Sequence, residues 1–360
     1  MRKAFVSDCE GPISKNDNAF ELTAHYVPNG EHLFTVISRY DDLLADVLKR
    51  PGYKAGDTLK LILPFLKAYG VTDRKMQSFS AKTLILISNV KEALRHIRTM
   101  APAFIVSTSY EHYIKALCRA INFPYENTYC TKVSIDKHEL NQEEKTRLRE
   151  LAEEIAKMPI IEIPSGAKSI KDLSEEHRKV VQRLDEIFWG EISYMKIGRI
   201  LDEVNPIGGR EKAGAVEHVA QSLEIGLEDV MYVGDSITDV EAFTLVRVHG
   251  GLAVSFNGNR YAIRNSEIAI LSESSLTTAI IAELFILFGK NEVLRAVENW
   301  SRETLEKSHV NKAMLKKFFS LYPEKLPKVE RITNENIEAL ARESEEFRKK
   351  VRGEAVGRLG

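Results

Sequence analysis

Two acidic side chains near the N-terminus, Asp8 and Glu10, are close enough in the chain to act together, because a single residue separates them. They follow a short apolar run at residues 4–6 and precede the turn-forming residues Gly11 and Pro12. An apolar run this short, ended by turn residues, is typical of a buried strand in a parallel sheet. Two carboxylates crowded at the end of such a strand repel each other, and a bound divalent cation is the usual way to offset their charge.

Hydroxyl side chains follow a second apolar run. Residues 103–106 are succeeded by Ser107, Thr108 and Ser109, and an amphipathic helical pattern starts directly afterwards. Hydroxyls and unpaired backbone N–H groups at the start of a helix make a site for an anion. The same three residues could equally do no more than cap the helix, so both interpretations remain open at this point.

Two more carboxylates follow a third apolar run. The segment GDSITD at residues 234–239 ends the run at residues 229–233, and it contains Asp235 and Asp239. In open α/β sheets, ligands bind at the carboxyl ends of the strands. We therefore expect these two carboxylates to lie at the same edge of the sheet as the first pair.

A lysine, Lys212, lies on the first turn of a predicted helix that follows the glycine-rich turn at residues 205–209. Its ammonium group could neutralise phosphoryl oxygens as a point positive charge. Lys212 could also be an ordinary surface lysine, and Lys196 is its competitor for the cationic position.

Four segments resemble the motifs of the haloacid-dehalogenase-like (HAD) hydrolase superfamily: SDCEGPIS, FIVSTS, the lysine of GGREKAGAVEHV, and YVGDSITDVEAF. A further segment, GGLAVSFNGN, is most similar to the phosphoserine-phosphatase-like branch. The resemblance implies an α/β fold with a Rossmann-like, mostly parallel sheet and helices on both faces, and the helical patterns of the chain add helical cap insertions and a helical C-terminal extension to this expectation. The resemblance covers the core, and neither the insertions nor the C-terminal helices.

The resemblance also implies an activity, the Mg²⁺-dependent hydrolysis of a small phosphomonoester. Asp8 would attack phosphorus to give an aspartyl-phosphate, which water then hydrolyses, while Glu10 exchanges a proton with the leaving oxygen and with the water. A dianionic phosphate repels a carboxylate, so the site must first neutralise charge. The implied roles are Mg²⁺ binding by Asp8, Glu10 and Asp235, phosphate binding by Ser107, Thr108 and Lys212, and support of Lys212 or of metal-bound water by Asp239.

Glu10 departs from the pattern of this superfamily, whose phosphatases usually have Asp two positions after the nucleophile. Some phosphoserine-phosphatase-like members resemble this chain in having Glu, whose extra methylene moves the acid by about one bond length. A phosphotransferase or mutase would use the same residues. The DCEGP signature also resembles an archaeal branch in which some relatives are accessory subunits of an energy-converting hydrogenase. A non-catalytic or regulatory accessory subunit of a larger complex is therefore the alternative function.

A length of 360 residues indicates two or three domains. Helical patterns broken by Pro and Gly separate the strand-like runs. They divide the chain into a catalytic core (1–15, 88–135 and 205–277), a helical cap insertion (16–87), a second insertion (136–204) and a helical C-terminal extension (278–360). We expect the first insertion to roof the site and to select the substrate, because it begins directly after the predicted nucleophile strand. The charge runs of the second insertion are typical of a solvated face. The basic residues near the end of the chain are interleaved with acids and lack aromatic neighbours, which argues against a nucleic-acid role.

The overall charge is balanced, with 51 Lys and Arg residues against 52 Asp and Glu residues, so no global field indicates nucleic acid or an anionic membrane. The three cysteines show no CxxC spacing, which argues against a disulfide framework or a zinc ribbon. The most apolar segment, residues 279–288, is about half the length needed to span a bilayer, and no leader precedes the first strand. We expect a cytoplasmic protein that binds a small phosphorylated metabolite, with C-terminal helices that pack on the core, on a second copy of the chain or on another protein.

Overall fold

A seven-stranded sheet forms the centre of the core, and the computed structural model describes residues 2–164, 166–357 and 359. The strand order is β3-β2-β1-β4-β5-β6-β7, in which the first six strands are parallel and β7 is antiparallel to β6. This confirms the predicted α/β class with a mostly parallel sheet. The strands are β1 (Ala4–Ser7), β2 (Ala103–Tyr110), β3 (Thr128–Thr131), β4 (Val230–Gly234), β5 (Leu252–Phe256), β6 (Ile268–Leu271) and β7 (Lys328–Arg331).

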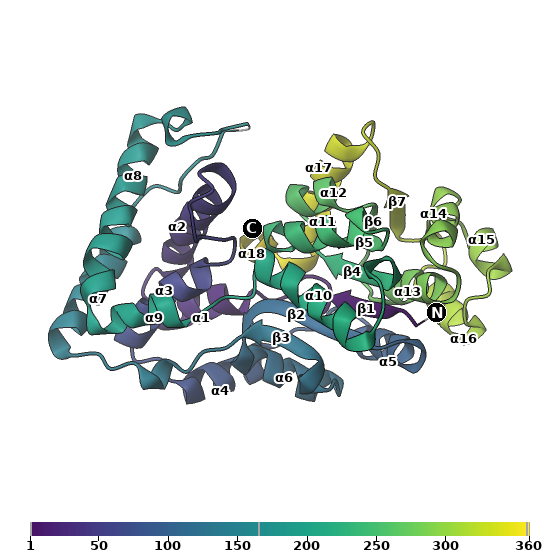
Figure 1. Cartoon of the computed structure of the whole chain (residues 1–360), viewed down its shortest axis with the longest axis horizontal. Helices are drawn as coiled ribbons and strands as arrows, with labels where there is room; N and C mark the ends of the chain where they lie inside the picture. The colour runs from purple at the N-terminus through teal and green to yellow at the C-terminus, as the bar shows by residue number, and fades with distance from the viewer. Residues whose placement is uncertain (1, 165, 358, 360) are drawn as a thin grey trace.

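Helices cover both faces of the sheet (Figure 1). Successive residues of a strand point to opposite faces, so Phe5 packs in one apolar cluster while Ala4 and Val6 pack in another. The Phe5 face is covered by α5 (Val90–Met100), α6 (Glu111–Ile121), α13 (Leu276–Phe288), α14 (Lys290–Glu298), α15 (Arg302–Lys307) and α16 (Lys312–Leu321). The opposite face is covered by α10 (Arg210–Leu223), α11 (Val240–Val248) and α12 (Arg260–Asn265).

The two insertions form one cap. Helices of the first insertion, α1 (Asn18–Tyr26), α2 (Gly30–Asp42) and α3 (Thr58–Ala68), share a single apolar cluster with α7 (Gln142–Ile155), α8 (Glu175–Asp185) and α9 (Ile200–Glu203) of the second. They lie together at the left of Figure 1. The apolar faces of α3 and α7 cover each other, so helices of both predicted insertions contribute to one cluster. A further helix of the first insertion, α4 (Asp73–Thr83), contributes Met76 to the same cluster and also packs on α6 of the core.

The C-terminal extension packs on the core of the same chain. Besides its helices it contributes β7, a strand that the sequence analysis did not predict. After β7, helix α17 (Ile337–Arg352) packs on α12, and the short α18 (Glu354–Gly357) ends between the cap and the core (Figure 1). Within the described residues, no helix combines the length and the apolar character needed to cross a membrane.

Candidate active site

Asp8 and Lys212 meet at the carboxyl end of the sheet. Asp8 directly follows β1, and its backbone N–H continues the pairing with β4 by donating to the carbonyl oxygen of Val233 at 2.7 Å. Its side chain is 6% exposed, and its Oδ2 lies 2.8 Å from Nζ of Lys212. Lys212 is fully buried on the first turn of α10. The predicted lysine is thus the one beside Asp8, whereas its competitor Lys196 is exposed on the cap.

Asp239 holds Lys212 from the other side. Its Oδ1 lies 2.7 Å from Lys212 Nζ and accepts a hydrogen bond from the Tyr232 hydroxyl at 2.7 Å. Its Oδ2 accepts from the backbone N–H groups of Asp235 and Ser236 at 2.9 and 3.0 Å, which closes the GDSITD loop. Burial disfavours the charged form of Asp239, but the positive charge of Lys212 outweighs this effect and lowers the pKa of Asp239. These contacts place Asp239 in the supporting position that the sequence analysis assigned to it.

The two carboxylates that flank Lys212 differ in their ionisation. Burial raises the pKa of Asp8 to about 7, against the lowering effect of Lys212. Burial disfavours the charged ammonium of Lys212, but Asp239 and Asp8 together raise its pKa above the ordinary lysine value. Lys212 therefore stays charged at neutral pH.

Asp235 is bound by two arginines to which the sequence analysis gave no role in the site. Arg348 and Arg352 of α17 both donate to its Oδ2, the latter at 3.0 Å. The three side chains are nearly inaccessible to solvent, with exposures of 2% to 4%. Gly11, at φ +106°, makes room for this cluster, because a Cβ atom there would lie 2.0 Å from Asp235 Oδ2. Asp235 is thus confined between the turn after β1 and the C-terminal helix.

The predicted hydroxyl groups lie at the end of β2, next to Asp8 on β1. Ser107 Oγ accepts from the backbone N–H of Ser109 at 3.2 Å, which leaves its own proton available for another acceptor. The Thr108 hydroxyl donates to the carbonyl oxygen of Ile207 at 3.0 Å. Ser107 and Thr108 both line the same pocket as Asp8, so the structure brings the predicted phosphate-binding residues to the predicted nucleophile.

Glu10 lines that pocket too, but its carboxylate faces the cap. Its Oε1 accepts a hydrogen bond from the backbone N–H of Asn18, the first residue of α1, at 2.7 Å. Burial raises its pKa well above the ordinary value. The carboxylates that approach one another closely enough for a shared ion are instead Asp8, Asp235 and Asp239, with oxygens within 4.8 Å of one another.

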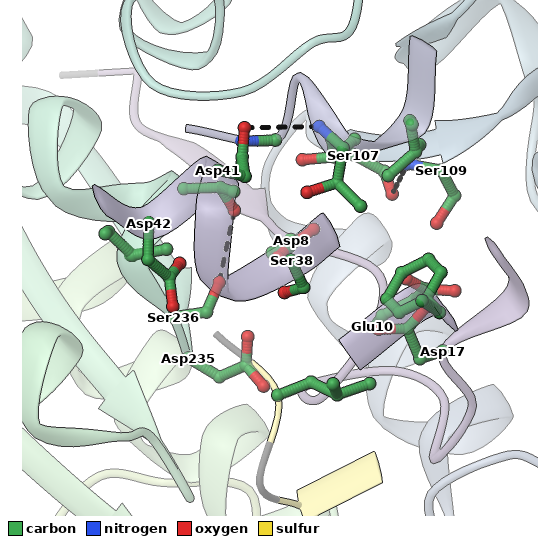
Figure 2. Close-up of a pocket in the computed structure, with 18 of the residues that line it drawn as sticks. Asp8, Glu10, Asp17, Ser38, Asp41, Asp42, Ser107, Ser109, Asp235 and Ser236 are labelled. Atoms are coloured by element: carbon green, nitrogen blue, oxygen red, sulfur yellow. Dashed lines mark hydrogen bonds between the residues drawn. The ribbon is translucent and has the colours of Figure 1, made fainter. Parts of the chain in front are cut away.

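The pocket is small and acidic, with a volume of about 100 Å³. Figure 2 shows Ser38, Asp41 and Asp42 of cap helix α2 around the same pocket as Asp8 and Asp235 of the core. Asp41 accepts from the Tyr53 hydroxyl at 2.7 Å and from backbone N–H groups of the turn before α3. Burial raises its pKa to about 8. Side chains of α2 thus line the same pocket as Asp8.

The arginines and Asp41 are the lining residues that sequence reasoning missed. One signal could have found Arg348: it continues the stripe of Ala341 and Ser344, both buried, at helical spacing. Arg352 lies one turn further along the same face. A charged residue in the buried stripe of an otherwise charged helix is the mark of a specific partner.

Comparisons with known proteins agree with this geometry. Residues 88–283, more than half of the chain, match the family model described as haloacid dehalogenase-like hydrolase. The structure of gene product AF1437 from Archaeoglobus fulgidus superimposes with a TM-score of 0.80 at 25% identity, covering 100% of this chain and 99% of that one. A phosphoserine phosphatase solved as a phospho-aspartyl intermediate analogue gives a TM-score of 0.45 at 12% identity, covering 74% and 92%.

A phosphoserine phosphatase in its apo form gives a TM-score of 0.40 at 12% identity, covering 76% of this chain and 96% of that one. No curated protein matches the sequence. The family match includes β2, α10, β4 and the GDSITD loop, which carry Ser107, Lys212, Asp235 and Asp239. The chain therefore belongs to the haloacid dehalogenase-like hydrolase family, which confirms the predicted superfamily and the prediction that the chain is a hydrolase.

Proposed function

We propose that this hydrolase releases phosphate from a small phosphomonoester through an aspartyl-phosphate formed on Asp8. The observation that carries the proposal is the buried pair of Asp8 and Lys212, 2.8 Å apart at the end of the nucleophile strand. A carboxylate can attack a phosphoryl group only where nearby positive charge offsets the repulsion. Lys212 provides such a charge, because it is paired directly with Asp8.

The remaining predicted residues fit the two halves of that reaction. Ser107 has a hydroxyl proton to donate to a phosphoryl oxygen, since its oxygen already accepts from Ser109. Thr108 uses its hydroxyl proton on Ile207, so we assign it to the wall of the phosphate pocket. Glu10, two residues after the nucleophile and on the pocket wall, would protonate the leaving oxygen and later take a proton from the attacking water.

The donor set of the site fits Mg²⁺. Asp8, Asp235 and Asp239 are buried, and they offer the hard carboxylate oxygens that this ion prefers. Asp239 accepts hydrogen bonds from Lys212, from Tyr232 and from two backbone N–H groups. Within the described residues, the carboxylate of Asp8 has only Lys212 and one backbone N–H as partners, so we assign the ion to Asp8 and Asp235. Glu10, also predicted as a ligand, directs its carboxylate to Asn18. Bound there, the ion would neutralise phosphoryl charge during the attack.

The pocket volume and the cap favour a small substrate. A space of about 100 Å³ beneath α2 suits a compact phosphorylated metabolite and excludes a phosphorylated side chain on a folded protein. The cap would also keep bulk water from the nucleophile, which strengthens the charge interactions inside. We propose Ser38, Asp41 and Asp42 as the cap residues that contact the leaving group.

A screen of phosphorylated metabolites with Mg²⁺, followed by phosphate release, tests the proposal. We expect turnover of at least one small phosphomonoester and loss of that turnover in excess chelator or in the Asp235→Asn variant. Full activity in excess chelator would contradict the role of the metal. Silence across the panel would favour the alternative, a non-catalytic accessory protein, for which the pairing of Asp235 with two arginines is the supporting observation.

A further inference from the structure

The C-terminal helix delivers positive charge to the carboxylate that we assign to the metal. Arg348 Nη1 donates to Asp235 Oδ2 and, at 3.2 Å, to the backbone carbonyl oxygen of Asp235. Arg352 Nη1 donates to the same Oδ2 at 3.0 Å. Two guanidinium groups with side-chain exposures of 3% and 4% therefore converge on one carboxylate oxygen.

The charge that they bring equals that of one divalent cation. The carboxylates of Asp8, Glu10, Asp17 and Asp235 line the pocket, and the other core cation near them, Lys212, is already paired with Asp8 and Asp239. Without the arginines, Asp235 would be a buried carboxylate with no paired cation among the described residues. The two arginines thus do for Asp235, in electrostatic terms, what a bound divalent cation would do.

This arrangement also contains two unfavourable interactions, which would favour a competing ligand for Asp235. The two guanidinium groups carry like charges and share one acceptor, which is unfavourable at short range. Nε of Arg348 is a buried donor with no hydrogen-bond partner among the described residues, and such a group costs about 1–3 kcal/mol. A cation that bound Asp235 in place of the two arginines would relieve both unfavourable interactions.

The helix is anchored away from the site. Leu340 and Ala341 pack against Ile263 and Leu271 of the core, and the Ser344 hydroxyl donates to the carbonyl oxygen of Gly258 at 2.6 Å. The end of the helix makes different contacts, because Arg352 donates from Nε to the carbonyl oxygen of Lys15 at 3.0 Å and from Nη2 to that of Asn16.

Lys15 and Asn16 form the segment in which the chain passes from the core into the cap. Arg352 therefore links Asp235 to the base of the cap, while Val356 and Leu359, just beyond the helix, pack in the apolar cluster of the cap. A movement of the last turn of α17 would therefore change the contacts of Asp235 and also those at the base of the cap.

From these contacts we propose that the C-terminal segment is an internal competitor for the divalent cation of the site. Arg348 and Arg352 hold Asp235 when no cation is bound, and a cation that binds Asp235 displaces them together with the last turn of α17. The inference rests on the proposed metal role of Asp235. It adds that the affinity for the cation is set by residues outside the family match, which ends at residue 283.

The test measures cation binding directly, by calorimetric titration of Mg²⁺ and of Mn²⁺ into the full chain. We expect the double variant Arg348→Met, Arg352→Met to bind roughly tenfold more tightly than the wild type, a typical size for coupling between competing contacts. The matched control is Arg342→Met, an exposed arginine on the same helix that donates only to the Glu338 carbonyl oxygen, and its affinity should equal that of the wild type. Equal or weaker binding by the double variant would overturn the competition.

A second measurement needs no substitution and guards against a variant that fails to fold. Hydrogen exchange of the wild-type chain should become faster over residues 345–357 when Mg²⁺ is added, while exchange around Leu340 stays unchanged. Unchanged or slower exchange at the end of α17 on saturation with Mg²⁺ would contradict the proposal. Absence of cation binding in both the wild type and the double variant would contradict both the competition and the metal role of Asp235. The proposed phosphatase activity could then still be tested separately, by measuring phosphate release without metal.

Discussion

The two halves of the site neutralise their carboxylates in different ways. On one side, Asp8 and Asp239 share a single cation, Lys212, and all three residues belong to the core. On the other side, Asp235 alone is paired with two cations, Arg348 and Arg352, which come from the C-terminal extension. The first half is therefore built by residues at the carboxyl ends of the central strands and by α10, whereas the charge balance of the second half depends on the last long helix of the chain, α17. The difference separates a half that is complete within the core sheet and its helices from a half that needs the C-terminal segment.

The largest expected effect is on the lysine half of the site. Asp8→Asn removes the nucleophile with little change of shape, so turnover should fall by at least about a thousandfold. Thermal unfolding should show that the variant is folded and as stable as the wild type or more so, because a buried negative charge is removed. The control is Asp229→Asn, a carboxylate that pairs with Lys3 outside the site. An Asp8→Asn variant that releases phosphate at nearly the wild-type rate would exclude the covalent mechanism.

The second prediction concerns stability in the same half. Lys212→Met leaves two buried carboxylates without their shared cation, which should cost about 3–5 kcal/mol in the free energy of unfolding. Denaturant titration at pH 7 measures this loss. Lys290→Met serves as the control, since Lys290 forms a more exposed pair with Glu267 at 2.6 Å and should cost less than about 1 kcal/mol. An equal decrease in the free energy of unfolding in the two variants would show that the buried Lys212 pairs stabilise the fold no more than the more exposed Lys290 pair does.

The lysine half could be predicted from the sequence for a physical reason. Short apolar runs ended by polar residues located β1, β2 and β4, and parallel strands necessarily present their carboxyl ends at one edge of the sheet. The position of each motif after its strand then sufficed to bring Asp8, Ser107 and Asp239 together. The same local patterns gave α5 its bounds, Val90–Met100, because an apolar stripe and a following proline define a helix without any tertiary information.

The arginine half was missed because the helical stripe that contains Arg348 indicates burial, whereas the partner of the two arginines depends on tertiary packing. Arg348 and Arg352 lie among Lys and Glu residues, and a helix of that composition reaches the surface in most proteins. Nothing in the chain before β7 specifies that α17 will pack on α12 and end at Asp235. The strand β7 was missed for a related reason: its four residues, KVER, carry only one apolar side chain, and their pairing with β6 depends on tertiary packing.

A third prediction tests whether either arginine alone can neutralise Asp235, in contrast to Lys212, which is the single cation that its two carboxylates share. Arg352→Met leaves Arg348 on Asp235, so the variant should lose only about 1–2 kcal/mol of stability, mainly from the lost bonds to Lys15 and Asn16. The Arg348→Met, Arg352→Met double variant should lose clearly more than the two single variants together, since only then is Asp235 left unpaired. Denaturant titration of the three variants in chelator gives the values. Strict additivity would mean that the arginines do not substitute for each other.

The smallest expected effect concerns a pocket carboxylate that has neither kind of partner. Asp41 forms no ion pair within the described residues, and its pKa is raised to about 8 by burial. In the unfolded chain its pKa returns to the ordinary value near 3.8. Between these two values the folded state holds the proton that the unfolded state has released, so this group favours folding at low pH, and its contribution is lost as the pH rises toward 8.

We therefore expect the free energy of unfolding to fall between pH 5 and pH 8, and the Tyr53 hydroxyl and the Gly56 N–H reduce this loss because they stabilise the charged form. In Asp41→Asn this part of the pH dependence should disappear, so the free energy of unfolding should fall less steeply over the same interval. Asp46→Asn, an exposed carboxylate a few residues further along, should leave the slope as in the wild type. Denaturant titrations at several pH values compare the three proteins. Identical slopes for Asp41→Asn and the wild type would mean that Asp41 is already ionised in the folded chain, and that the cap, like the two halves of the core site, supplies it with compensating charge.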